Sequence, residues 1–256
     1  MTGSRGNVTN QSSIACISDK SRHGLIPVSF FMAKIITNLT GAISKLNTLY
    51  NGSSTPPSSG EEDYLVWTDL LNIGINIWEG EEGMLWRQLF VKLADAPDGD
   101  KTTDGSNSYD CPSLFKFPNS SVVWLGTGTN KTSYKVIKQE DIQLYENNRG
   151  NWCYFLMDGT PTLEFNPNIT IASGQTISYN YYKYASSLSS GSDLFDMSDP
   201  MFSVFYALSE LKKEEGDTSA LTIATQKLDA MKTLDNMVAD FQDDSGFSPI
   251  GAGLGI

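Results

Sequence analysis

Apolar residues recur every three or four positions along two stretches in the first third of the chain, which predicts two amphipathic helices. The first covers residues 35–49 and the second covers residues 62–79. The second has two apolar stripes at the same spacing, so it needs two packing partners. We expect one stripe to face the core of the subunit, and the other to face a second layer of the same subunit or a neighbouring copy. The stripes are Val66, Leu70, Ile73 and Ile77, and Trp67, Leu71, Ile75 and Trp78.

Three further stretches have helical spacing. After Gly80 and Gly83 the pattern resumes over residues 84–93, which predicts a continuation of the helical run. Near the end of the chain, a helix is predicted to begin at Asp199-Pro200, where a capping oxygen precedes proline, and to end before Gly216. Thr218 is expected to cap the last helix. The apolar positions of these last two helices predict an antiparallel pair.

The centre of the chain has short runs of β-branched and aromatic residues separated by turn residues, which predicts strands. Asp158-Gly159 lies between two such runs and indicates a hairpin, because glycine accepts the positive φ of a tight turn. We therefore expect an α+β fold in which a small antiparallel sheet or barrel is inserted into a helical domain. The strands are predicted at residues 121–125, 133–138, 142–145, 152–157, 162–165 and 176–184.

Changes in composition suggest the organisation of the chain. Residues 1–31 are rich in Ser, Asn and Gly, which indicates an irregular arm; either it is a genuine assembly arm or Met32 is the true start. The helical domain is expected to combine residues 32–94 with residues 185–244. The β insertion is expected over residues 95–184. A flexible Gly-rich tail is expected at the C-terminus, over residues 245–256.

The charge balance limits the possible partners. The chain has 18 basic and 30 acidic residues, a formal net charge of −12, so its surface repels nucleic acid phosphates. An apolar patch at residues 25–31 is interrupted by Pro27 and is too short to span a bilayer. We expect a soluble protein without tight DNA binding or a membrane partner.

The residue types that carry common catalytic chemistry are scarce. His23 is the single histidine, and Cys16, Cys111 and Cys153 lack the spacing of a zinc site or a disulfide framework. Gly126-Thr-Gly128 lacks the third glycine of a dinucleotide-binding loop. We expect no catalytic residue, no metal site and no cofactor.

Three other patterns leave alternatives open. Aspartates in a loop favour either a calcium site or an ordinary acidic loop, and pairs of carboxylates favour either glycoside hydrolysis or helix caps and solvated faces. Alternating tyrosines favour either stacking on sugars or bases, or cross-strand packing. These residues are Asp95, Asp98, Asp100 and Asp104; Glu61 with Glu62 and Asp193 with Asp196; and Tyr179, Tyr181, Tyr182 and Tyr184.

The order of these elements resembles the head-to-tail adaptor family of tailed double-stranded DNA bacteriophages, over roughly residues 33–243. It is similar in particular to the tail-tubular or gatekeeper-like adaptors that carry a β domain inside a helical one. The motifs that carry the resemblance are Trp-Thr-Asp-Leu-Leu-Asn72-Ile-Gly, Trp86-Arg87, Tyr-Tyr-x-Tyr ending at Tyr184, Leu188-Ser, Asp193, Asp199-Pro200 and Phe205-Tyr206-Ala-Leu208. The β block and the arm before Met32 depart from the smaller, all-helical members.

The resemblance implies a structural virion protein that is not an enzyme. It implies a homo-oligomeric ring, commonly of twelve subunits, made in the bacterial cytoplasm and placed at the head-to-tail interface. The ring would dock beneath the portal protein, contact tail or nozzle proteins and continue the channel for double-stranded DNA during ejection. The alternatives are a β-domain carbohydrate-binding or tail-fibre module and, less favoured, a hydrolase. Candidate interface residues are Trp67, Leu71, Ile75, Trp78, Trp86, Phe205, Met231, Phe247 and Ile250.

Overall fold

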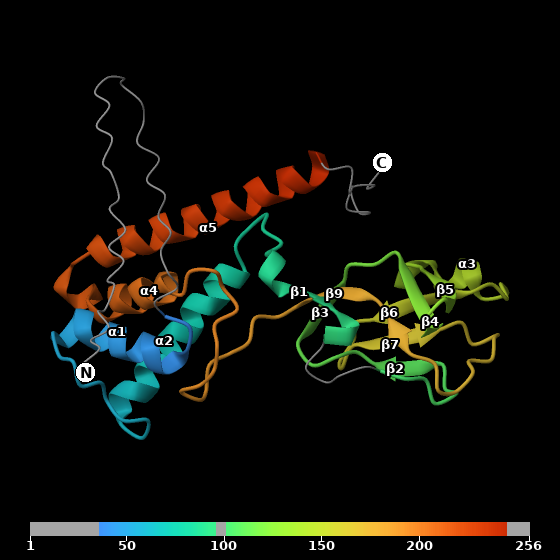
Figure 1. Cartoon of the computed structure of the whole chain (residues 1–256), viewed down its shortest axis with the longest axis horizontal. Helices are drawn as coiled ribbons and strands as arrows, with labels where there is room; N and C mark the ends of the chain where they lie inside the picture. The colour runs from blue at the N-terminus through green and yellow to red at the C-terminus, as the bar shows by residue number, and fades with distance from the viewer. Residues whose placement is uncertain (1–35, 96–100, 245–256) are drawn as a thin grey trace, which may run out of the picture. The chain divides into compact units, whose positions relative to one another are not determined.

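The structure is a computed structural model that describes residues 36–95 and 101–244 (Figure 1). It has an α+β fold, as predicted, with helices and two sheets. The predictions for the N-terminal arm, His23, Cys16, Asp98, Asp100 and the C-terminal tail lie outside the described residues.

The first two helices form close to their predicted positions. Helix α1 covers Leu39–Asn51, and its N-cap Asn38 accepts a hydrogen bond from the Gly41 amide. It ends at Gly52, whose positive φ of 66° suits the left-handed cap conformation. Helix α2 covers Glu62–Glu79 and has two acidic residues in its first turn, where the helix dipole favours negative charge.

The last two helices are α4, Met201–Leu211, and α5, Ser219–Asp244. They pack against each other, and α4 also packs against α1 and α2, so α4 lies between α5 and the first two helices (Figure 1). An aspartate two residues before the first helical residue accepts a hydrogen bond from that residue's amide in each helix: Asp199 accepts from Met201 and Asp217 accepts from Ser219. Pro200 is the N-cap of α4 and has no capping side chain. Thr218, the predicted capping residue, immediately precedes α5, and its carbonyl accepts from the Thr222 amide at 3.1 Å.

The strands form two sheets. A six-stranded sheet has the order β2-β7-β6-β5-β4-β8, and a three-stranded sheet has the order β1-β9-β3. Among the strands of the described residues, all pairs are antiparallel except β5 with β6, so the larger sheet is mixed instead of purely antiparallel. The strands are β1 Phe90–Lys92, β2 Ser108–Asp110, β3 Phe115–Pro118, β4 Val122–Thr127, β5 Asn130–Val136, β6 Trp152–Leu156, β7 Thr162–Phe165, β8 Ile177–Ser178 and β9 Asn180–Lys183.

Three local predictions were wrong. Residues 176–184 form two strands, β8 and β9, which belong to different sheets, instead of one strand. Residues 84–93 do not continue the helical run: they form a 3-10 turn at Arg87–Leu89 and then strand β1, which pairs with β9. Residues 142–145 form the short helix α3, Ile142–Tyr145, instead of a strand. Further 3-10 turns are Leu93–Asp95, Gln139–Asp141 and Lys213–Glu215.

The hairpin expected at Asp158-Gly159 is present, since β6 and β7 pair antiparallel on either side of it. Its connection is longer than a two-residue turn, because the last paired residues are Leu156 and Thr162. Gly159 has a φ of 73° in this connection. The sequence therefore indicated the reversal but not its length.

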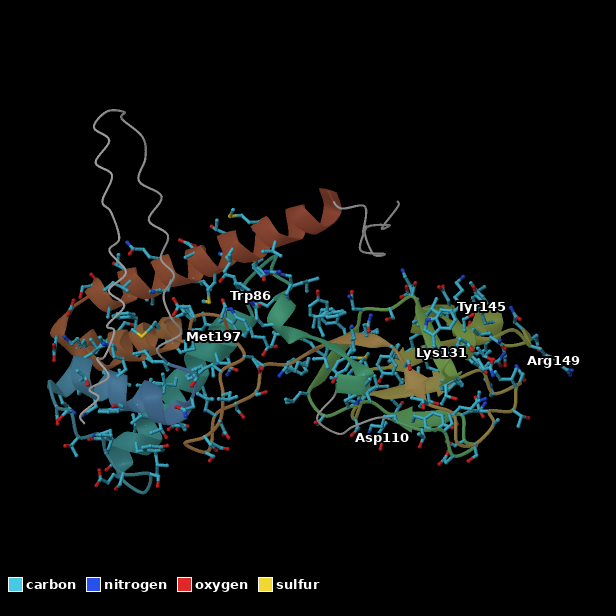
Figure 2. All side chains as sticks on the ribbon, in the orientation of Figure 1. Trp86, Asp110, Lys131, Tyr145, Arg149 and Met197 are labelled. Atoms are coloured by element: carbon cyan, nitrogen blue, oxygen red, sulfur yellow. The ribbon has the colours of Figure 1, made fainter. Side chains whose placement is uncertain are left out.

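Buried apolar side chains of the described residues gather in two clusters. The first is built by the helices and includes Trp86 and Met197, which Figure 2 labels. The second lies among the strands and includes Phe155 and Phe165. Strand β9 joins the two, because Tyr181 belongs to the strand cluster whereas its neighbour Tyr182 packs against the helical cluster.

Candidate assembly interface

Helix α2 buries one of its apolar stripes and exposes most of the other, whose Leu70 is half-buried against the helical cluster. Trp67, Leu71, Ile75 and Trp78 are buried in the helical cluster. On the opposite side Val66, Ile73 and Ile77 are 45%, 44% and 38% exposed, next to the exposed Leu65. The exposed side chains between residues 65 and 77 include a single charge, on Asp69. We call the exposed residues Leu65, Val66, Asp69, Ile73, Asn76 and Ile77 the α2 face.

Helix α5 also turns a charge-poor face outward. Among residues 219–238, twelve are exposed, and Asp229 is the one charged residue among those twelve. Exposed helix surfaces normally carry several charges, because ionised side chains keep their hydration there. Leu234 and Met237 are 54% and 53% exposed, and Ile223 lies on the same side of the helix. We call Ile223, Gln226, Asp229, Ala230, Thr233, Leu234 and Met237 the α5 face; Asp229 is its one charged residue.

The other charges on α5 in this range point toward the rest of the chain. Three ion pairs join α5 to the loop after α2 and to the start of α4, and a buried aspartate takes part in one of them. The Glu81 carboxylate, which accepts a hydrogen bond from Lys232, raises the pKa of that ammonium group above its usual value. Charged side chains therefore fix α5 to its own chain while apolar ones face outward. The pairs are Arg87–Asp235 at 3.0 Å, Lys227–Asp199 at 2.9 Å, and Lys232–Glu81.

Most of the predicted interface residues lie inside a single copy of the chain. Six of them are at most 4% exposed and belong to the helical cluster, and Phe205 is partly buried against it. Their side chains are therefore core residues, and the surface of α2 that remains available is the other stripe. Phe247 and Ile250 lie outside the described residues. The six are Trp67, Leu71, Ile75, Trp78, Trp86 and Met231.

The tyrosines near the end of the β insertion divide between core and surface. Tyr179 and Tyr181 are buried in the strand cluster, where ring contacts with Phe115 surround them. Burial raises the pKa of Tyr179 well above its usual value. Tyr182 packs against Phe90 and Phe117, and Tyr184 is 48% exposed. Cross-strand packing accounts for the first three, so Tyr181 in particular offers no stacking platform to a sugar.

The carboxylate pair at Asp193 and Asp196 has structural partners. Asp193 accepts hydrogen bonds from the amides of Ser189 and Ser190, which hold the pKa of its carboxyl below its usual 3.8. Asp196 forms an ion pair with Lys183 at 2.8 Å and accepts from the Ser186 amide. Each carboxylate therefore orders a turn of the chain that returns from the sheets to α4.

The two described cysteines, Cys111 and Cys153, are free and buried, and burial raises the pKa of each thiol to about 12. Within the described residues, no three His, Cys, Asp or Glu side chains gather where they could hold a metal ion. In the acidic loop, Asp104 accepts from the Ser106 amide, which is the geometry of a local turn.

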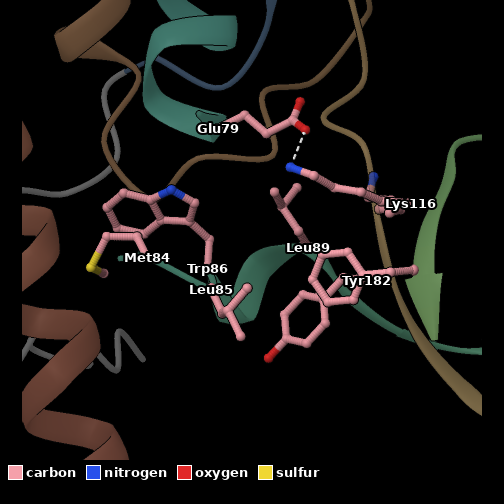
Figure 3. A pocket seen from close by; sticks show the side chains of 9 residues that line it. Glu79, Met84, Leu85, Trp86, Leu89, Lys116 and Tyr182 are labelled. Carbon is pink, nitrogen blue, oxygen red and sulfur yellow. Dashed lines mark hydrogen bonds and ion pairs between the residues drawn. The ribbon is translucent and has the colours of Figure 1, made fainter. Parts of the chain in front are cut away.

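A small pocket lies where the end of α2 meets strands β3 and β9 (Figure 3). Its charged lining residues are Glu79, Lys116 and Lys183. One carboxylate oxygen of Glu79 accepts from Lys116 at 2.7 Å and the other accepts from the Ala185 amide at 2.9 Å. Trp86, Leu89 and Tyr182 also line it. The carboxylate is thus fully engaged in holding the strands to α2, and the space is too small for an organic ligand.

No helix in residues 36–95 and 101–244 combines the length and apolarity needed to cross a membrane. Comparison with known proteins adds no assignment: no protein-family model matches the sequence, and no curated protein matches it significantly.

The α5 face was missed in the sequence, although a signal for it was there. The predicted apolar side of this helix was Leu221, Ala224, Leu228, Met231 and Val238. Ala224, Leu228 and Met231 are buried, whereas Leu221 is 46% exposed and Val238 is half-buried. Ile223, Leu234 and Met237 lie outside that pattern. These apolar residues lie away from the buried stripe of α5, and the charged residues among positions 219–238 lie mostly on its buried side. Such a distribution is typical of a helix with a second contact surface.

Proposed function

We propose that this chain is a structural, non-enzymatic virion protein that forms an oligomeric ring at the head-to-tail junction of a tailed bacteriophage. The proposal joins the family resemblance in the motifs of α2, β9 and α4 to one structural observation. That observation is the presence of two exposed, charge-poor apolar faces, on α2 and on α5. Such surfaces are typical of protein contacts rather than of a solitary domain.

The charge of the chain supports the same role. With a net charge of −12, a ring of copies would present a strongly negative surface to any DNA that passes through it. Tight phosphate binding needs clustered Lys and Arg that release counterions, and such binding would hold DNA in place. A conduit must let DNA slide, so a negative wall suits the role.

The non-enzymatic part of the proposal rests on the sequence and on the partners of the acidic residues. The chain has one histidine and three cysteines, and Asp193 and Asp196 are engaged in ordering the chain before α4. The carboxylates of Asp193 and Asp196, the pair that could serve glycoside hydrolysis, therefore stabilise the local structure.

Electron microscopy of the purified full-length chain mixed with a portal protein tests this function. We expect rings, of about twelve copies if the resemblance holds in detail, stacked coaxially on the portal. A chain that binds no portal, and that stays monomeric in its presence, would contradict the proposed function.

A further inference from the structure

The α2 face and the α5 face belong to different surfaces of the same chain. Helix α4 packs against both helices, and each of them turns its buried stripe toward the shared core. The exposed faces are therefore available together, and neither needs to be uncovered by a rearrangement. A molecule with two separate contact faces can bind two neighbours at once.

The two faces match in spacing and in length. On α2 the exposed apolar positions Val66, Ile73 and Ile77 are separated by seven and four residues. On α5 the positions Ile223, Ala230, Leu234 and Met237 are separated by seven, four and three. The α2 positions extend over eleven residues in three turns and the α5 positions over fourteen residues in four turns, so each set keeps its side chains along one side of its helix. At 1.5 Å per residue they extend for roughly 17 and 21 Å, so they can pack along their whole lengths.

The charges favour a second copy of this chain as the occupant of each face. Two copies that each carry −12 repel one another, and the repulsion is least where the contacting surfaces hold the least charge. The α2 face has Asp69 as its one charged residue and the α5 face has Asp229. A basic partner would gain more from the acidic surfaces elsewhere, whereas a copy of the same chain gains most from these two faces.

We propose that the α5 face of one copy packs against the α2 face of the next copy, with Leu234 and Ile73 near the centre of the contact. This contact is heterologous, because each copy contributes a different face on each side, and repeated contacts of that kind close into a ring when the rotation fits. An α5-to-α5 contact would instead stop at a dimer. The inference rests on the proposed ring and identifies the surfaces that build it.

The test uses two variants of the full-length chain, Ile73→Glu and Leu234→Glu, each of which places a charge at the centre of one face. Native mass spectrometry at tens of micromolar protein is expected to show an oligomer for the wild type and monomers for each variant. Leu144→Glu is the matched control, since Leu144 is 81% exposed on α3 and belongs to neither face; it should assemble like the wild type. Ile73→Gln and Leu234→Gln repeat the test with a milder change, and circular dichroism checks each fold.

Mixing the two variants identifies the pairing. The Ile73→Glu chain keeps an intact α5 face and the Leu234→Glu chain keeps an intact α2 face, so an equimolar mixture should form a one-to-one heterodimer. A mixture that remains monomeric, variants that still assemble, or a wild type that is monomeric on its own would each overturn the inference. The proposed function has a separate readout, because rings on the portal could still be seen by electron microscopy in any of these cases.

Discussion

Single polar side chains hold the chain where it returns from the sheets to the helices. The Asn72 amide on α2 donates to the Leu188 carbonyl at 2.9 Å and accepts from the Leu188 amide at 2.8 Å. One side chain thus replaces the backbone pairing that this irregular segment lacks. Asn47 plays a similar part after α1, where it donates to the carbonyls of Ser53 and Thr55.

Asn72→Ala should lower the free energy of unfolding by about 1–3 kcal/mol, because both partners on Leu188 lose their hydrogen bonds in a half-buried site. Chemical denaturation measures this change. Gln143→Ala is the control, since Gln143 is exposed on α3 and belongs to neither the α2 face nor the α5 face, and it should have an effect near zero. Equal effects of the two substitutions would show that the Leu188 contact does not stabilise the fold.

The turn before α4 should make stability depend on pH. Two amides donate to Asp193 and hold the pKa of its carboxyl below 3.8. The ionised carboxylate therefore contributes fully to the free energy of unfolding above pH 3.8, and this contribution is lost as the pH falls through the lowered pKa. Asp193→Asn should therefore be less stable than the wild type at pH 7, and the difference should shrink below about pH 3.8 in thermal unfolding scans. Asp158→Asn, at an exposed aspartate in the connection between β6 and β7, serves as the comparison. A difference that grows on acidification would contradict this assignment.

At the scale of elements, α5 is held by two kinds of contact. Its first half packs through apolar residues such as Ala224 and Leu228, whereas Asp235 farther along is buried and paired with Arg87. A buried carboxylate is costly when its partner is removed, because the charge remains without compensation. The ion pair thus fixes the direction in which α5 presents its exposed face.

Arg87→Met should destabilise the chain by about 1–3 kcal/mol, less than for a fully buried pair because the Arg87 side chain is 35% exposed. The double variant with Asp235→Leu should recover much of this loss, since no unpaired charge remains. Denaturation of the single and double variants gives the coupling. Lys213→Met is the control: it breaks an exposed pair with Glu210 and should change stability little. If the stability changes of Arg87→Met and Asp235→Leu simply add in the double variant, the account is contradicted.

The sequence allowed long periodic elements to be predicted well and short ones poorly. Helices α1, α2, α4 and α5 each bury a stripe of several large apolar residues, and such stripes are visible as spacing. Strands β1, β2 and β3 have three or four residues each and exist because of pairing with distant segments, as between Phe90 and Tyr182. That pairing is a tertiary effect that no local pattern contains.

The candidate interface was only partly predictable for a related reason. The two stripes of α2 were recognised, but their spacing is the same, so spacing could not tell which one is exposed. The stripe with Trp67 and Trp78 is the buried one, in keeping with the larger apolar area of its side chains. An interface was predicted at Trp67 and Trp78 because these residues are strongly apolar. Both side chains are instead buried in the core of the single chain.

At the scale of the whole molecule, a strongly acidic chain exposes apolar residues where charges would be expected. Net negative charge makes copies of the chain repel one another, and this repulsion is weakest where the α2 and α5 faces meet. An assembly built through them would bury apolar area and leave the acidic surfaces facing water and passing DNA. Its stability should therefore rise with salt, because salt screens the repulsion without weakening apolar contacts.

The most direct test of the central claim is the mass of the assembly that the full-length chain forms with a portal protein, measured by native mass spectrometry. A single complex that contains a closed ring of the chain, about twelve copies on the portal, is the predicted result. A chain that remains a monomer both alone and with the portal would contradict the account.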